Sequence, residues 1–326
     1  MKTFDQYLSI VNEAINNIKD RYPKQPADLY NPIYYTMALG GKRLRPVLML
    51  MACEAVGGKA GDALIPAIGL ELFHNFTLLH DDLMDRADVR RGKPTVYRKW
   101  NDNVAILSGD AMLTMATQHI ARARAEVLPE VMELFNKTAM EIYEGQQWDM
   151  DFESRTDVKV DEYLKMIRLK TSVLLGCACK MGAILGGASK ALANDFYHMG
   201  VNIGLAFQLQ DDVLDVWGDP ATFGKATGGD IMNNKKTFLL LNAMNMATGD
   251  DAVELNHWLS ATDADPAQKI PAVTAIYEKL GLRDMSDGYI SMYSNHALET
   301  LAAMRIDKDA AQAFADLTVK LIKRDR

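Results

Sequence analysis

Apolar side chains recur every three or four residues along nearly the whole chain, which is the period of an amphipathic α-helix. We find no convincing run of alternating apolar and polar residues of the kind that forms a β-strand. The chain is therefore expected to be all-α. The predicted helices cover about residues 4–20, 31–39, 44–57, 62–88, 102–122, 129–152, 160–187, 190–217, 234–247, 251–260, 267–281, 284–304 and 307–324.

Helix-breaking residues separate these segments, but nothing divides the chain into independent parts. Glycine pairs stand at 40–41 and 57–58, and proline-containing breaks at 91–94 and 218–220. There is no Pro/Ser-rich linker and no repeat of fixed length. We therefore expect a single large helical domain over residues 1–326. The most loop-like segment is 217–236, and loops of that length are usually functional or disordered.

Composition and charge exclude some classes of function. The 326 residues carry a net charge of −7 and have a pI near 5.4, which argues against a nucleic-acid binder. The N-terminal segment has no long apolar core and no cleavage site, so we expect no signal peptide. The apolar segment 171–188 contains Lys180 and many small residues, so we expect a packed core helix and no stable membrane insertion. These features favour a cytoplasmic protein.

The cysteines give no sign of a metal or redox site. Cys53, Cys177 and Cys179 are few, odd in number and set in apolar surroundings. A Cys-x-Cys pair could bind a metal, but no second pair accompanies it. Buried thiols in a reducing compartment are the expected state.

One acidic motif occurs twice, each time after an apolar helical run. HDDLMD spans residues 80–85, and QDDVLD spans 210–215. The first and fifth residues of each DDxxD lie on one helix face, because an α-helix has 3.6 residues per turn. Two carboxylates side by side repel one another unless a cation neutralises them. Ligands that are oxygen atoms alone favour Mg²⁺, which often completes its shell with water and substrate phosphates.

A solvated acidic helix end is the simpler interpretation of one such motif. Two copies, each preceded by apolar rather than charged sequence, favour metal binding instead.

Basic clusters that could bind phosphate accompany the acidic motifs. GGKRLRP, residues 40–46, places two glycines before a predicted helix start, where backbone N–H groups and the helix dipole favour an anion. Lys42 and Arg45 add full positive charges there. RRG, residues 90–92, supplies Arg90 and Arg91, whose planar guanidinium groups suit phosphate oxygens.

Further candidates lie on predicted helices. RLKTS, residues 168–172, places Lys170 and Thr171 in mid-helix, and His74 lies two turns before Asp81 on the same face. Each basic cluster alone could be an ordinary solvated surface, and a lone histidine is usually structural. Together with two acidic motifs, they indicate a site for two diphosphates, one held through magnesium and one by basic residues alone.

The motifs, in this order and spacing, resemble those of the trans-isoprenyl diphosphate synthases. The matching stretches are GGKRLRP, HDDLMD…RRGKPT, KTS, FQLQDDVLD and FGKATGGDIMNNKKT, within about residues 36–240. The resemblance implies a large all-α bundle with the two Asp motifs facing one another across a central cavity, usually in a homodimer. It also implies condensation of isopentenyl diphosphate with an allylic diphosphate, using three magnesium ions per site.

The resemblance assigns a role to each matching position. The implied metal ligands are Asp81, Asp85, Asp211 and Asp215. The residues implied to contact the allylic diphosphate or its developing cation are Arg90, Lys170, Thr171, Gln208, Lys225 and Lys235. Those implied to hold isopentenyl diphosphate are Lys42, Arg45, His74 and Arg91. The residues expected to be catalytic are Asp81, Asp85, Asp211, Lys170, Thr171 and Gln208.

Product length is expected to depend on the helix that carries the first motif. That motif has two residues between its carboxylate pair and its last Asp, whereas bacterial-type farnesyl diphosphate synthases carry four. Phe76 and Phe73 precede Asp81 by five and eight positions, or about 7.5 and 12 Å at about 1.5 Å per residue. An aromatic residue five positions before the first Asp implies the twenty-carbon geranylgeranyl diphosphate, with farnesyl diphosphate as the alternative. A helical wheel puts Phe73 nearer the Asp81 face than Phe76, so which ring closes the cavity stays open, and both rings could be ordinary packing.

Two other functions fit part of the pattern. A class I terpene cyclase also ionises a diphosphate in an all-α cavity, but it would leave GGKRLRP and the second arginine unexplained. A non-catalytic partner subunit of a synthase tends to lose an Asp motif, and both motifs are intact here.

Overall fold

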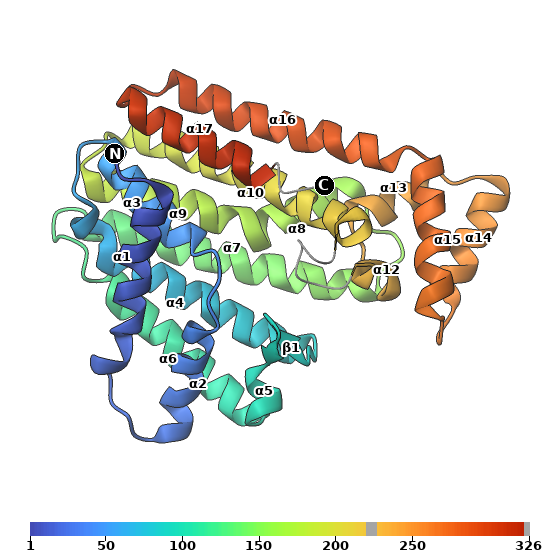
Figure 1. Cartoon of the computed structure of the whole chain (residues 1–326), viewed down its shortest axis with the longest axis horizontal. Helices are drawn as coiled ribbons and strands as arrows, with labels where there is room; N and C mark the ends of the chain where they lie inside the picture. Colours follow the sequence, from blue (N-terminus) through green and yellow to red (C-terminus); the bar gives the residue numbers. More distant parts are fainter. Residues whose placement is uncertain (220–226, 323–326) are drawn as a thin grey trace. The chain divides into compact units, whose positions relative to one another are not determined.

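The computed structural model describes residues 1–219 and 227–322, and helices make up most of this part of the chain (Figure 1). The all-α prediction is thereby confirmed. The structure gathers into two compact units, each built from separate stretches of sequence. Unit 1 comprises Met1–Asn136, Cys177–Tyr197 and Met304–Ala313, and unit 2 comprises the remaining described residues. The expectation of one domain over 1–326 stays a prediction.

Unit 1 is built around α4, which packs against both α3 and α6. Most of α4 is apolar on every side, and Leu70, Leu72 and Phe73 are fully buried, as expected for a helix enclosed by others. The helical elements of unit 1 are α1 (Phe4–Asn16), η1 (Ile18–Asp20), α2 (Ala27–Ala38), α3 (Leu44–Ala55), α4 (Ala60–Met84), α5 (Val96–Lys99) and α6 (Asp102–Ile120).

A short hairpin, which no alternating pattern in the sequence had indicated, follows α4. β1 (Val89–Arg90) pairs antiparallel with β2 (Lys93–Pro94). The two turn residues, Arg91 and Gly92, have φ values of 54° and 72°, which is the pattern of a tight type I′ hairpin turn. Strands of two residues are too short for a visible alternation. The helix predicted to reach residue 88 ends at Met84, because Arg86 takes a left-handed conformation (φ 52°).

Unit 2 has its own core, formed by side chains within residues 231–282. Ile231, Leu239, Leu240, Tyr277 and Leu282 belong to one buried cluster of this unit. Its helices are α8 (Val160–Ile167), η2 (Arg168–Ser172), α12 (Gly229–Met232), α13 (Phe238–Met246), α14 (Gly249–Ser260), α15 (Pro266–Lys279) and α16 (Leu282–Ala303). Helices that contribute residues to both units are α7 (Leu128–Ser154), α9 (Val173–Gly186), α10 (Lys190–Trp217) and α17 (Lys308–Ile322).

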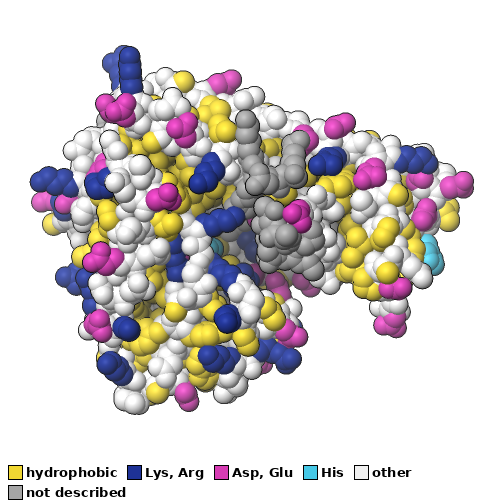
Figure 2. All heavy atoms as spheres, in the orientation of Figure 1, with side chains coloured by type: hydrophobic (Ala, Val, Ile, Leu, Met, Phe, Trp, Pro, Cys, Tyr) yellow, Lys and Arg dark blue, Asp and Glu magenta, His cyan; other side chains and the backbone are white. Residues whose placement is uncertain are grey.

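One described stretch, Val160–Gly186, is long and apolar enough to cross a membrane. However, 78% of its most apolar window is buried inside the protein, which is the behaviour of a core helix. Acidic, basic and apolar side chains are mixed over the face drawn in Figure 2. The expectation of a packed core helix at 171–188 agrees with this burial.

Candidate active site

The first acidic motif ends α4 with one aspartate buried and two more accessible. Asp81 is half-buried and Asp85 is exposed, and the Asp85 N–H donates to the Asp81 carbonyl at 2.8 Å. This bond places the two carboxylates one helical turn apart, as the spacing predicted. Asp82 between them is only 5% exposed. The outer two carboxylates are therefore the pair that a ligand can reach.

Arg90 from β1 neutralises the buried carboxylate. Its Nε lies 2.7 and 2.8 Å from the two Asp82 oxygens, and its guanidinium lies 3.7 Å from Asp81 Oδ2. Burial raises the pKa of Asp82, an effect that the hydrogen bonds from Arg90 oppose. Arg90 has its own pKa raised by the three aspartates, against the effect of its burial. The hairpin therefore brings Arg90 to the carboxylates of α4.

Arg91 connects the hairpin to the glycine pair of GGKRLRP. Its guanidinium donates to the Gly40 carbonyl and lies over Gly41, where a Cβ atom would come 2.7 Å from Arg91 Nη2. Gly41 also has φ +126°, a conformation that side chains rarely adopt. The two glycines thus allow the close approach of Arg91. As a result, the predicted clusters 40–46 and 90–92 meet in unit 1.

Arg45 and His74 also meet in unit 1. Arg45 Nη1 lies 3.2 Å from His74 Nε2. Burial and the nearby arginines hold the pKa of His74 well below its usual value, so the imidazole is neutral at pH 7. Burial likewise lowers the pKa of Arg45, to about 10. Lys42, by contrast, is exposed.

A buried ion pair that was not identified from the sequence supports this basic segment. Arg43 has φ 46°, is 4% exposed and donates to Glu71 Oε1 at 2.7 Å and to the Met37 carbonyl at 2.5 Å. Asn75 Nδ2 donates to the same Glu71 oxygen at 3.1 Å. Arg43 lies between Lys42 and Arg45, so the buried pair anchors the chain at a point between these two cations. A lone Glu71 in an otherwise apolar helical run was the available signal.

The two aromatic rings expected to limit product length are both buried on α4. The Phe73 ring contacts Phe135 edge-on, with centroids 5.2 Å apart. The Phe76 ring lies 5.6 Å from Phe73 and 4.8 Å from the imidazole of His80. Their role in product length stays a prediction.

The second acidic motif, on α10, repeats the burial pattern of the first. Asp211 and Asp215 are half-buried, whereas Asp212 is 4% exposed. Asp212 accepts hydrogen bonds from the Tyr163 hydroxyl and, at 3.3 Å, from Gln208 Nε2. Burial and the charge of Asp230 raise the pKa of Asp212 to about 7, against these two hydrogen bonds. In both motifs the middle aspartate belongs to the protein interior.

Lys170 and Thr171 do not lie in a plain α-helix, as the sequence suggested, but in the π-helical turn η2. Such turns widen a helix by one residue and often occur at functional sites. Gly145 of α7 makes room for this turn, since a Cβ there would come 2.4 Å from the Lys170 nitrogen. Gly204 of α10 does the same beside Ser172, at 2.6 Å from its Cα.

Side-chain contacts tie this turn to its neighbours in unit 2. Lys170 Nζ lies 2.6 Å from Asp149 Oδ2 of α7. Thr171 Oγ1 donates to Gln208 Oε1 at 3.2 Å, and Gln208 in turn reaches Asp212. The sequence analysis missed Asp149, Gly145 and Tyr163. The spacing of Gly145 and Asp149, one helical turn apart, was a signal that could have found two of them.

Gly228 and Asp230, beyond the second motif, hydrogen-bond to Asp215. Asp215 Oδ2 accepts from the Asp230 N–H at 3.0 Å, and the Asp215 carbonyl accepts from the Gly228 N–H at 2.6 Å. Lys235 follows, with its N–H donating to the Asp230 carbonyl at 2.9 Å. Lys225, which the sequence analysis also assigned to the allylic diphosphate, lies outside the described residues.

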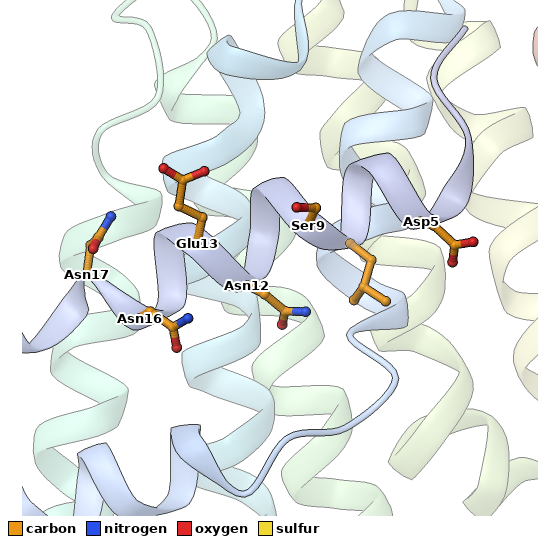
Figure 3. Close-up of a pocket in the computed structure, with 7 residues that line it drawn as sticks. Asp5, Ser9, Asn12, Glu13, Asn16 and Asn17 are labelled. Atoms are coloured by element: carbon orange, nitrogen blue, oxygen red, sulfur yellow. The ribbon is translucent and has the colours of Figure 1, made fainter.

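In residues 1–219 and 227–322, no three Asp, Glu, His or Cys side chains gather into a ready-made metal cage. Magnesium does not need one, because it usually takes one or two protein carboxylates and completes its shell with water and phosphate. Pairs of hard carboxylate oxygens one turn apart fit that preference. A hollow on the polar face of α1, lined by residues such as Asp5, Asn12 and Glu13, contains none of the predicted site residues (Figure 3).

Comparison with known proteins shows the same kind of protein throughout. The family model of polyprenyl synthetase matches residues 26–280. The geranylgeranyl diphosphate synthase of Methanosarcina mazei is 45% identical over 221 residues, which are 67% of this chain and 68% of that protein.

Solved structures agree over the whole length. A crystal structure of a geranylgeranyl pyrophosphate synthase matches with a TM-score of 0.94 and 43% identity, covering 100% of both chains. The geranylgeranyl pyrophosphate synthase of Corynebacterium glutamicum, solved with isoprenyl diphosphate and magnesium, matches with a TM-score of 0.83 and 26% identity over 99% of this chain and 97% of that one. The chain therefore belongs to the polyprenyl synthetase family, whose members are trans-prenyltransferases.

Proposed function

We propose that this short-chain trans-prenyltransferase condenses isopentenyl diphosphate with allylic diphosphates to make geranylgeranyl diphosphate. The observation that carries the proposal is the shared burial pattern of the two acidic motifs. Each motif buries its middle aspartate against a protein partner and leaves its outer two more accessible. Two motifs built alike suit a reaction in which carboxylates act on one diphosphate. The naming of the relatives supports the choice of product.

Magnesium is the proposed cofactor, with three ions per site. The ligands would be Asp81 and Asp85 in unit 1 and Asp211 and Asp215 in unit 2. The related enzyme of Corynebacterium glutamicum, solved with magnesium, supports this choice. When bound, magnesium neutralises the negative charge that builds up on the departing diphosphate.

Arg90 beside the first motif and several residues around the second would act on the allylic substrate. Lys170 and Arg90 already have carboxylate partners, Asp149 and Asp82, which keep these cations in place before substrate binds. Lys225 and Lys235 would add charge to the same diphosphate. Thr171 and Gln208 present neutral dipoles, which can stabilise a developing allylic cation without capturing it.

The basic segment of unit 1 would hold isopentenyl diphosphate. Lys42, Arg45 and Arg91 provide the charge, and the neutral His74 provides a hydrogen bond without adding a further cation to a crowded site. The double bond of isopentenyl diphosphate attacks the allylic carbon, and the proton lost afterwards goes to the departing diphosphate. Phe76 or Phe73 would stop the chain at twenty carbons.

Product analysis tests this function. Purified protein is incubated with magnesium, isopentenyl diphosphate and each allylic starter in turn, and the dephosphorylated products are separated by chromatography. The proposal predicts geranylgeraniol as the main product from every starter shorter than twenty carbons. Cyclic hydrocarbons would instead indicate a terpene cyclase, and no turnover with any starter would indicate a non-catalytic subunit.

A cytoplasmic homodimer is the proposed state of the protein. Ile106 and Leu107 of α6 are 44% and 60% exposed, and large apolar side chains exposed on a helix are compatible with a subunit contact. Light scattering coupled to size-exclusion chromatography tests this directly. The mass should be twice the chain mass of 36.3 kDa, and Leu107→Glu should halve it.

A further inference from the structure

Lys269, on α15, is a fully buried lysine outside every motif discussed above. Its side chain is 1% exposed, although lysine is almost never fully buried unless it is paired. Its ammonium group donates to Asn234 Oδ1 at 2.7 Å and to the Met232 carbonyl at 3.2 Å. Burial lowers the pKa of Lys269 below its usual value. Burying an amine costs free energy unless it is hydrogen-bonded. The question is therefore what these two hydrogen bonds do for the protein.

Both acceptors lie in the segment that ends at Lys235. Met232 is the last residue of α12, and the last carbonyl groups of a helix have no partner within that helix. Asn234 has φ 50°, a left-handed conformation that costs a non-glycine residue free energy. Asn234 also donates through Nδ2 to the Leu259 carbonyl at 3.0 Å. Lys269 thus satisfies the end of α12 and holds Asn234 directly before Lys235.

The other end of the same segment is held as well. Gly228 and Asp230 donate to Asp215 at 2.6 and 3.0 Å. Next to Lys269 in sequence, Ile270 packs on Gly228 so closely that a Cβ there would come 2.6 Å from Ile270 Cδ1. Two consecutive residues of α15 therefore contact residues 228–234 at both ends. This segment is hydrogen-bonded to Asp215 at one end and leads into Lys235 at the other. Both residues are proposed to act on the allylic diphosphate.

We propose that Lys269 is a positioning residue, which fixes residues 228–235 so that Lys235 is in place for the allylic diphosphate. It acts through Asn234 and the end of α12, without touching the substrate. The identity of the ligand of Lys235, an allylic diphosphate, rests on the function proposed above. The tether itself does not, because it is a property of the protein without substrate.

The test uses Lys269→Met, which keeps an unbranched side chain of similar length but removes the donor. Lys279→Met is the matched control, because Lys279 lies on the same helix with a side chain 66% exposed. Hydrogen exchange of the substrate-free protein, followed by mass spectrometry, reports on residues 228–237. In Lys269→Met, residues 228–237 should exchange at least tenfold faster, and exchange elsewhere should be unchanged. Lys279→Met should match the wild type throughout. Unchanged exchange at 228–237 would overturn the tether.

Steady-state kinetics then separates positioning from general stability. Lys269→Met should raise the KM for the allylic diphosphate about tenfold while the KM for isopentenyl diphosphate stays within twofold. Equal changes in both constants, or faster exchange throughout the protein, would mean that Lys269 only stabilises the fold. If the wild type shows no prenyl transfer, the proposed function fails, and the exchange result still decides the tether.

A second variant covers the case in which Lys269→Met does not fold. Asn234→Gly removes the side-chain acceptor while suiting the left-handed conformation, and it leaves the Met232 contact intact. It should show a smaller but still local increase in exchange at 228–237. Wild-type exchange in Asn234→Gly would overturn the proposed role of that contact.

Discussion

At the scale of single residues, the middle and outer aspartates of each motif have different surroundings. Asp82 and Asp212 are buried and bonded to Arg90 and Tyr163, whereas the outer aspartates are more accessible. The sequence predicted which positions share a face, because helical spacing determines it. It could not predict the partners of the middle positions, because Arg90 reaches Asp82 through a hairpin and Tyr163 reaches Asp212 from another helix.

Removing an outer aspartate should abolish most activity and spare the fold. We expect Asp81→Ala and Asp211→Ala each to lower kcat at least about a hundredfold, since a metal clamp contributes several kcal/mol and each ~1.4 kcal/mol is tenfold in rate. Circular dichroism should be unchanged, because removal relieves repulsion between like charges. Glu133→Ala, at an exposed position of α7, is the control and should keep full activity. Near wild-type turnover in either aspartate variant would contradict the magnesium assignment.

Truncating Phe76 should lengthen the product. Phe76→Ala opens space on α4 without touching the carboxylates, so products longer than twenty carbons should appear on chromatography. Stability should fall by about 3–5 kcal/mol, the usual cost of a buried Phe→Ala change. Leu72→Ala, at a fully buried position of the same helix, is the matched control. It should lose stability but keep the product length. If Phe76→Ala, Phe73→Ala and the double variant all keep the product length of the wild type, the end of the cavity lies elsewhere.

At the scale of elements, most helices were predictable and their irregularities were not. The predicted ranges 44–57, 102–122 and 190–217 agree with α3, α6 and α10 to within two residues at each end. The π turn at Arg168–Ser172 has the same apolar pattern as a helix, so no change of period marks it in the sequence. Its cause lies in other helices, in the missing side chains of Gly145 and Gly204.

A methyl group at Gly145 should disturb the π turn. The added Cβ would lie 2.4 Å from the Lys170 nitrogen, so the backbone of Lys170 and Thr171 must shift. We expect Gly145→Ala to lower kcat at least tenfold. Gly288→Ala on α16 is the control, because a Cβ there meets nothing within 4 Å. That variant should keep its activity and gain about 0.5–1 kcal/mol of stability. Equal activity of the two variants would show that the π turn tolerates displacement.

The Arg43–Glu71 pair should carry much of the stability around the basic segment. Glu71→Gln leaves the Arg43 charge buried without its counterion, and breaking such a pair costs about 3–5 kcal/mol. Urea unfolding measures this loss. Asp102→Asn, which breaks the exposed pair with Arg86, is the control and should cost less than about 1 kcal/mol. Similar losses in both variants would mean that burial of the Arg43 pair has little energetic effect.

At the scale of the whole molecule, the sequence indicated the acidic and basic residues better than the residues that hold them in place. The motifs predicted the acidic and basic residues, because these residue types follow directly from diphosphate chemistry. The supporting residues Glu71, Asp149, Tyr163 and Lys269 come from distant parts of the chain, so local pattern could not connect them with the site.

In the proposed function, the outer carboxylates of both motifs bind an allylic diphosphate through magnesium. Calorimetric titration with an unreactive allylic thiodiphosphate tests it most directly, because binding is measured without turnover. We expect tight binding with magnesium, at least a hundredfold weaker binding after chelation, and the same weakening in Asp81→Ala and in Asp211→Ala. Binding of equal strength with and without magnesium, or full affinity in either variant, would contradict the assignment of these carboxylates as magnesium ligands.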